Sequence, residues 1–111
     1  MKLIISIVQD EDASRLVNQL MKNGYGVTKL ATTGGFLRAG NTTLLIGLDD
    51  DKLHAVMDII EHVCKSRKQI TTTPSVMGSM GGMPGAASYP VEVTVGGATV
   101  FVLSVDQFVK L

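Results

Sequence analysis

Residues 2–23 have the sequence KLIISIVQDEDASRLVNQLMKN, and most of the predicted fold follows from this segment. Residues 2–8 are mostly Ile, Leu and Val between polar neighbours, which is typical of a buried β-strand. Asp10 is expected to cap a helix over about 11–23, and Gly24 is expected to end it in the left-handed conformation. The apolar residues of this helix recur at helical spacing, namely Ala13, Leu16, Val17, Leu20 and Met21. A helix with one apolar face requires a sheet beneath it.

The following residues repeat this order of strand and helix. Strands are predicted over 25–32 and 42–48, and a second amphipathic helix over about 50–65 opens on three acidic residues, Asp49 to Asp51. Residues 66–90 carry three prolines and a glycine cluster, so we expect a long flexible loop there.

The C-terminal part predicts a hairpin. Residues 91–95 alternate strictly, Gly96-Gly97 offers a tight turn, and 98–105 continues the apolar pattern. The complete order predicts an α+β fold of ferredoxin-like type, a β-α-β-β-α-β sandwich with a C-terminal hairpin and both helices on one face of the sheet. The opposite face keeps Leu, Ile and Val residues, which favours a closed ring of subunits.

Composition and length narrow the classes of function. A chain of 111 residues is expected to form a single domain over 1–111. Ten Lys and Arg residues balance ten Asp and Glu residues, which argues against binding of a nucleic-acid polymer. No apolar run reaches the length of a membrane span, and Cys64 is a single cysteine without an internal disulfide partner. We therefore expect a cytoplasmic protein that does not associate with membranes.

Residues 32–43 are the strongest candidate for a binding site. The glycines in this segment allow backbone N–H groups to converge on an anion, and Arg38 adds a charged fork. Asn41 offers a donor and an acceptor to a purine edge, and Phe36 offers a ring for stacking. From chemistry alone, an ordinary turn between two strands, with Phe36 in the core, is an equally good interpretation.

Two alternative functions stay open on the residues alone. His54, Asp58 and His62 recur every four residues on the second helix, which resembles metal-ligand spacing but also fits a solvated face. A metal-binding trimer of the same fold is therefore one alternative. A nucleotide-acting enzyme is the other, although no Ser-His-Asp or Cys-His arrangement stands out to carry catalysis.

Three sequence strings occur one after another along the chain: Val8-Gln9-Asp10, TKLATTGGFLRAGNTT at 28–43, and PVEV followed by VGGATVFVL at 90–103. They resemble the cyclic di-AMP receptor proteins of the PII-like signal transduction superfamily. The resemblance covers nearly the whole chain, and only 66–89 has no clear match.

This resemblance implies a non-enzymatic sensor that assembles into a PII-like homotrimer and holds one cyclic di-AMP in each cleft between neighbouring subunits. By position, Thr28 and Asn41 would form hydrogen bonds with the ligand, Gly47 would allow its close approach, and Phe101 would form an apolar wall. The short ligand loop at 33–41 would contribute Gly35, Phe36, Leu37 and Arg38. The ligand would order this loop, the 66–90 loop, or both, and a protein partner that the sequence does not identify would read the result. No cofactor is implied.

Two positions depart from the family pattern. Family members commonly have an arginine two residues before the position of Thr28, where this chain has Gly26. They also commonly end in a longer polar stretch, whereas this chain ends in Val109-Lys110-Leu111. Loss of an arginine–phosphate contact weakens binding by about 1.5–3 kcal/mol. Lys29, Arg38 and Lys110 are candidates to compensate.

Overall fold

The computed structural model describes residues 1–30, 40–74 and 88–111, and the chain forms two compact units. The first unit comprises Met1–Lys65 and Gly96–Leu111, and the second comprises Ser66–Val95. Each unit has an antiparallel sheet, and the first also has two α-helices, so the protein belongs to the small α+β class.

A four-stranded sheet is the base of the first unit. Its strands are β1 (Lys2–Gln9), β2 (Thr28–Leu30), β3 (Asn41–Leu48) and β6 (Ala98–Ser104). They lie in the order β2-β3-β1-β6, and every neighbouring pair is antiparallel. This order is consistent with the ferredoxin-like arrangement predicted from the sequence.

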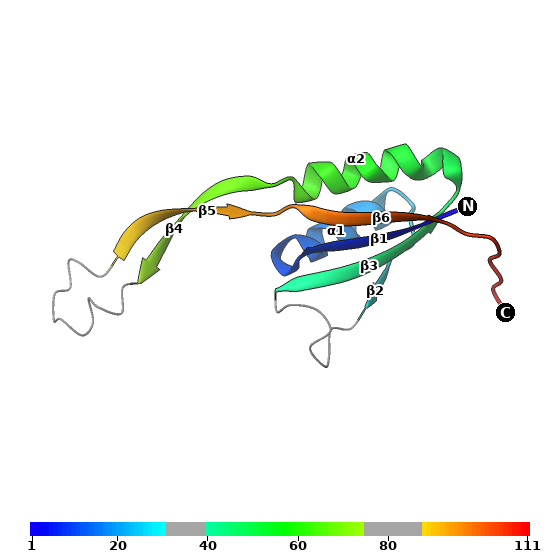
Figure 1. Ribbon diagram of the computed structural model, residues 1–111, viewed down its shortest axis with the longest axis horizontal. Helices are drawn as coiled ribbons and strands as arrows, with labels where there is room; N and C mark the ends of the chain where they lie inside the picture. Colours follow the sequence, from blue (N-terminus) through cyan, green and yellow to red (C-terminus); the bar gives the residue numbers. More distant parts are fainter. Residues whose placement is uncertain (31–39, 75–87) are drawn as a thin grey trace. The chain divides into compact units, whose positions relative to one another are not determined.

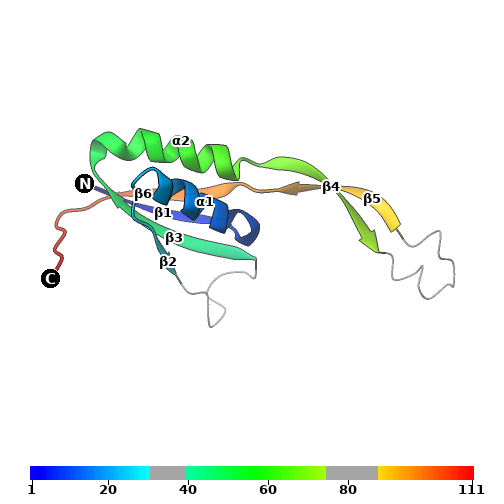
Figure 2. The same ribbon diagram turned by 180° about the vertical axis from the view of Figure 1, so that it is seen from behind.

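Two helices cover one face of this sheet. They are α1 (Asp10–Lys22) and α2 (Leu53–Cys64), and Figures 1 and 2 show both on the same side. Alternate residues of β1 point into the core beneath them, since Ile4, Ser6 and Val8 are buried while their neighbours are half-buried. The rest of the core comes from β3 and the apolar helix faces: Ala13, Leu16, Leu20, Leu44, Ile46, Leu48, Val56, Ile60, Val63 and Cys64.

The two ends of α1 test the predicted start and stop of this helix. Gly24 has a φ of +88°, the Gly24 N–H donates to the Met21 carbonyl, and the Tyr25 N–H donates to the Leu20 carbonyl. These two hydrogen bonds form a Schellman motif, so the predicted glycine stop is confirmed. The predicted cap at the other end is wrong. Asp10 is the first residue of α1, and its carboxylate instead accepts a hydrogen bond from the Thr42 hydroxyl.

The helix predicted over about 50–65 begins as a short 3-10 helix, η1 (Asp50–Lys52), and continues as α2. The N-terminal ammonium group of Met1 lies 2.9 Å from the Asp50 carboxylate. The hydrogen bond from this ammonium group holds the pKa of Asp50 below its usual value. The start of β1 is therefore tied to the start of the second helical segment.

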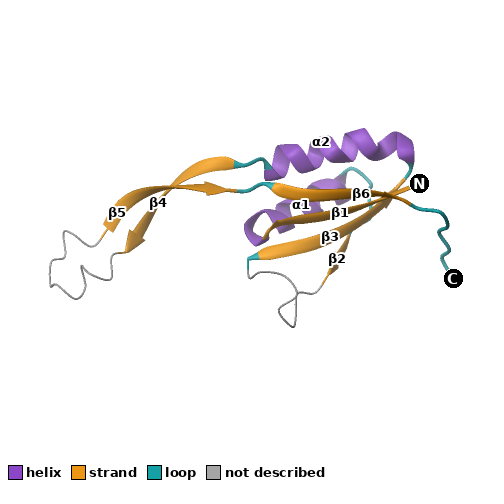
Figure 3. Ribbon diagram, viewed as in Figure 1, coloured by secondary structure: helices purple, strands orange, loops and turns teal. Residues whose placement is uncertain are grey.

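The second unit corrects two predictions. Strand β4 (Arg67–Pro74) pairs with β5 (Ser88–Val95) along eight antiparallel residue pairs. Figure 3 colours both segments as strands. The segment 66–90, predicted as a loop, therefore has strands at both ends, and 75–87 lie outside the described residues. The predicted hairpin of 91–95 with 98–105 is also wrong, because β6 pairs with β1.

The Gly96-Gly97 pair explains the second correction. Both glycines have positive φ, +85° and +88°, as in a tight turn. However, the Gly96 N–H donates to the Gln9 side chain and the Gly97 N–H donates to the Cys64 carbonyl. The two glycines therefore form hydrogen bonds with the end of β1 and the end of α2 rather than closing a hairpin.

The face of the sheet opposite the helices is apolar. Its central residues, Leu3, Ile5, Ile7 and Leu45, are half-buried, while Phe101 and Leu103 remain 52% and 45% exposed. The registers of β1 with β3 and with β6 place all six on this open face. Among the described residues, neither helix has the length and apolar character needed to span a membrane.

Candidate ligand-binding site

Of the predicted ligand loop over 33–41, only Gly40 and Asn41 are among the described residues. Strand β2 stops at Leu30, and Gly40, with a φ of +95°, leads into β3. The Gly40 carbonyl accepts a hydrogen bond of 2.8 Å from the Asp10 N–H. The start of α1 therefore holds the C-terminal base of the loop in place. Four predicted ligand-binding residues lie outside the described residues, namely Gly35, Phe36, Leu37 and Arg38.

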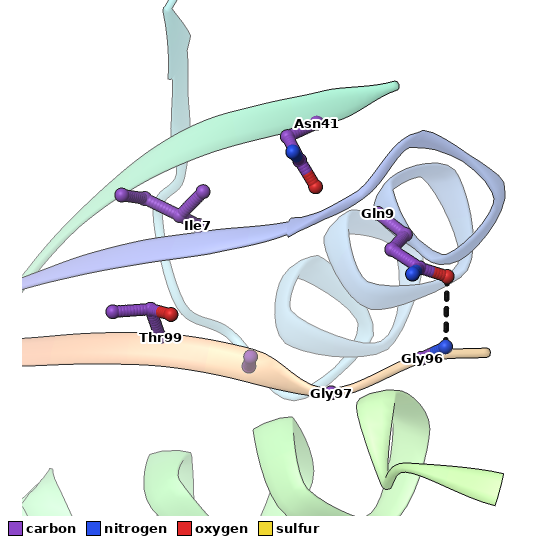
Figure 4. Close-up of a pocket in the computed structure, with 7 residues that line it drawn as sticks. Ile7, Gln9, Asn41, Gly96, Gly97 and Thr99 are labelled. Carbon is purple, nitrogen blue, oxygen red and sulfur yellow. Dashed lines mark hydrogen bonds between the residues drawn. The ribbon is translucent and has the colours of Figure 1, made fainter. Parts of the chain in front are cut away.

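Asn41 lies at an open cavity of about 280 Å³. The cavity lies where β1 ends and where β3 and β6 begin, and Figure 4 shows its side chains. None of its described lining residues is charged, so its polar groups are two carboxamides, one hydroxyl and the backbone. The lining residues are Ile7, Gln9, Asn41, Gly96, Gly97, Ala98 and Thr99. This composition suits an uncharged planar ring with polar edges better than a bare phosphate.

Gln9 is the main residue of this cavity that the sequence did not assign to the site. Its Oε1 accepts a hydrogen bond of 2.7 Å from the Gly96 N–H. Gln9 belongs to the Val8-Gln9-Asp10 string, but nothing in the string indicates that it faces Asn41. The pairing of Gln9 with Asn41 in the sheet register brings them together.

A second hollow, of about 400 Å³, adjoins the first. Gln9 and Asn41 line both, and the second is completed by Asp10, Glu11 and Gly40. The two carboxylates make this side acidic, so an anionic group would be disfavoured there. The two hollows therefore differ in charge: the first is lined by uncharged groups and the second is acidic.

Thr28 and Phe101 lie at opposite edges of the sheet. Thr28 pairs with Leu45, Leu45 pairs with Ile5, and Ile5 pairs with Phe101, so the four residues form one row across the strands. Three inter-strand spacings separate the ends of this row, which is about 14 Å. One subunit therefore does not bring Thr28 and Phe101 together.

Gly47 is exposed and lies six residues along β3 from Asn41, which is about 20 Å in an extended strand. A Cβ added at Gly47 would meet the terminal methyl group of Met1 at 3.4 Å, an ordinary contact. The fold therefore does not require glycine at this position, which leaves room for a functional reason.

The residues of the metal alternative lie on a solvated surface. The His54 and Asp58 side chains are 92% and 62% exposed, and His54 Nε2 lies 3.4 Å from an Asp58 carboxylate oxygen. Across 1–30, 40–74 and 88–111, no group of three potential metal ligands comes together. Cys64 is buried in the core, as its place on the apolar stripe predicted.

Comparison with solved structures supports this fold. A functionally unknown protein from Pediococcus pentosaceus ATCC 25745 is 43% identical in sequence, with a TM-score of 0.76. The match covers 99% of this chain and 96% of that one. A DUF3240 family protein from Shewanella baltica OS155 matches with a TM-score of 0.56 at 14% identity, over 99% of this chain and 94% of that one. The second likeness concerns the fold alone.

A family model described as cyclic-di-AMP receptor matches residues 1–111. This range includes the strings at 8–10, 28–43 and 90–103 that carried the resemblance, and also 66–89, which had no clear match. The description is that of a receptor family rather than an enzyme family. With a match over its whole length, the chain belongs to the cyclic-di-AMP receptor family.

Proposed function

We propose that this protein is a non-enzymatic sensor that binds cyclic di-AMP in clefts between the subunits of a homotrimer. The observation that carries the proposal is the place of Asn41, which comes from the most specific string of the family resemblance and lines an uncharged cavity. A volume of about 280 Å³ lies near the lower end of small-molecule sites, about 300–1,000 Å³. The cavity of one subunit is therefore small for a cyclic dinucleotide, and a neighbour would supply the rest.

The sheet register supports a composite site. Thr28 is on edge strand β2 and Phe101 is on edge strand β6, at opposite ends of one row. A ligand bound at one edge touches both residues only if they come from different subunits. The β2 edge of one subunit would then face the β6 edge of the next.

This pairing of unlike edges also favours a ring. A two-fold dimer places the same patch against itself, so β2 would meet β2 or β6 would meet β6. Contact of β2 with β6 is heterologous, and heterologous contacts generate closed rings. The family resemblance sets the number of subunits at three.

The open face of the sheet supports the same assembly. Leu103 and Phe101 expose about half of their surface there, beside Leu3, Ile5 and Leu45. Contiguous apolar surface of this kind usually marks an interaction site. In a ring, the part of this face around Leu3, Ile5, Leu45 and Leu103 would pack around the central axis and be removed from water, while Phe101 at the β6 edge would line the ligand site.

The signal would arise from two segments, the 33–41 loop and the segment between β4 and β5. The 33–41 loop would supply main-chain donors to the phosphates, which compensates in part for Gly26 in place of the usual arginine. Binding would order this loop or the segment between β4 and β5. A protein partner would then distinguish the bound form from the free form.

Calorimetry and mass measurement test the proposal directly. Purified protein is titrated with cyclic di-AMP, and cyclic di-GMP is the control ligand. We expect saturable binding of one cyclic di-AMP per subunit and a solution mass three times 11.8 kDa. Absence of binding below about 100 μM, equivalent to about 5.5 kcal/mol, contradicts the proposed ligand. A monomer or dimer at the concentrations used contradicts the composite site.

A further inference from the structure

Gln9 is the last residue of β1, and its side chain lies in the same cavity as Asn41. The backbone N–H of Gly96 can only donate a hydrogen bond, so the side-chain atom that accepts it, at 2.7 Å, is Oε1. This bond fixes which way the carboxamide points. Figure 4 shows Oε1 on the side of Gly96 and Nε2 on the side that faces the middle of the cavity.

A side-chain amide held in this way is a preorganised hydrogen-bond donor. A free glutamine side chain loses about 1.5–2 kcal/mol of rotamer entropy when a ligand immobilises it. The Gly96 N–H has already restricted the Gln9 side chain, so less of that cost remains when a ligand binds. The group offered to the ligand is an N–H donor without charge.

The surroundings indicate which chemical group accepts from this donor. Ile7 and Ala98 supply apolar surface, and Asn41 supplies a second carboxamide with both a donor and an acceptor. None of the described lining residues supplies a positive charge for a phosphate. Side-chain amides pair well with adenine, which combines an exocyclic amino donor with ring-nitrogen acceptors.

We propose that Gln9 is a ligand-binding residue, whose amide, oriented by the Gly96 N–H, donates a hydrogen bond to a ring nitrogen of an adenine in the cavity shared with Asn41. This inference rests on the proposed function, because it assigns a role within the same site. It differs from a purely structural role in which Gln9 only anchors Gly96 at the start of the connection to β6.

The Gln9→Glu variant separates the two roles. A carboxylate keeps an oxygen that accepts from the Gly96 N–H, but it has no N–H to offer and places a lone pair against the adenine nitrogen. We expect unchanged thermal stability and a loss of cyclic di-AMP affinity of about tenfold or more at pH 7.5, because a buried acceptor loses its partner. Gln19→Glu is the matched control. It makes the same change on the exposed surface of α1 and should leave affinity within about twofold of wild type.

Nuclear magnetic resonance provides a second readout that a structural role would not change. In wild-type protein, the side-chain NH₂ signals of Gln9 should shift on addition of cyclic di-AMP, and those of Gln19 should not. The inference is overturned if Gln9→Glu binds cyclic di-AMP with unchanged affinity, or if the Gln9 side-chain signals do not shift at saturating ligand. Either result leaves the proposed function intact. If wild-type protein fails to bind cyclic di-AMP at all, the proposed function and this inference both fall.

Discussion

Subunit mixing tests whether the ligand site is shared between neighbours. Thr28→Glu places a carboxylate at the exposed β2 edge, against an anionic ligand. Like charges about 4 Å apart at an effective dielectric constant of about 20 repel by about 4 kcal/mol, close to a thousandfold loss of affinity. Phe101→Ala removes a ring that is 52% exposed in the isolated subunit. If the ligand covers the remaining exposed surface, about 100 Å², the loss is about 2.5 kcal/mol or roughly 70-fold.

Neither variant alone should bind with wild-type affinity, but their mixture should. If each site takes Thr28 from one subunit and Phe101 from the next, random assembly of equal amounts leaves about one site in four with both residues intact. The two proteins are mixed in denaturant, refolded together and titrated calorimetrically. The fitted number of high-affinity sites should be about 0.25 per subunit.

A second mixture provides the control. Wild-type protein refolded with the Thr28→Glu/Phe101→Ala double variant should also keep about one intact site in four if the site is shared. If both residues act within one subunit, this control mixture keeps about half of its sites and the first mixture keeps none. That pair of results would refute the shared site. Size-exclusion chromatography with light scattering verifies that each mixture assembles like wild type.

Three further substitutions test separate parts of the structure. Asn41→Ala should weaken cyclic di-AMP binding by about five- to tenfold, the value of one or two hydrogen bonds, with little change in melting temperature, and a collapse in stability with binding intact would contradict its role. The methyl group of Gly47→Ala meets only the flexible end of Met1, at 3.4 Å, so thermal melting should show an unchanged fold. Calorimetry should show weaker binding of cyclic di-AMP, because the methyl group occupies the space that the ligand would approach. Normal affinity would mean that Gly47 is not part of the site. Ser6 is fully buried, and its hydroxyl has no hydrogen-bond partner among the described residues, so Ser6→Ala should stabilise the protein by about 1 kcal/mol in denaturant unfolding. A loss of stability would mean that the hydroxyl is satisfied.

Local patterns predicted the elements of the first unit well. The short apolar run at 2–8, the helical spacing from Ala13 to Met21 and the position of Gly24 depend on short-range geometry. Such geometry is encoded within a few residues. The predicted boundaries differ from the observed ones by one residue at each end of α1, and the helical segment predicted over 50–65 is observed as η1 and α2 over 50–64.

Pairing between distant segments was harder to predict. Residues 91–95 and 98–105 satisfy every local requirement of a hairpin, yet β5 pairs with β4 and β6 pairs with β1. Alternation identifies a strand but does not identify its neighbour. The two glycines between these strands bond to Gln9 and Cys64, contacts that span 87 residues in one case, and no local pattern reports them.

The residues of the candidate site also differ in whether local sequence or strand pairing identifies them. Asn41 was identified because it lies within a long, specific string. Gln9 was overlooked because its importance depends on strand register, which places it opposite Asn41 and within reach of Gly96. The separation of Thr28 from Phe101 is also a property of the sheet order rather than of the sequence near either residue.

The hydrogen bond from the Gly97 N–H to the Cys64 carbonyl has a consequence for how this gene can change. The chain leaves the first unit just after Cys64 and re-enters it at Gly96, so the excursion between them starts and finishes at neighbouring points. An insertion, deletion or transplanted sequence within that excursion need not disturb the sheet that carries the cavity. Such an arrangement lets evolution, or a protein engineer, exchange the segment 66–95 while the fold of the first unit is kept.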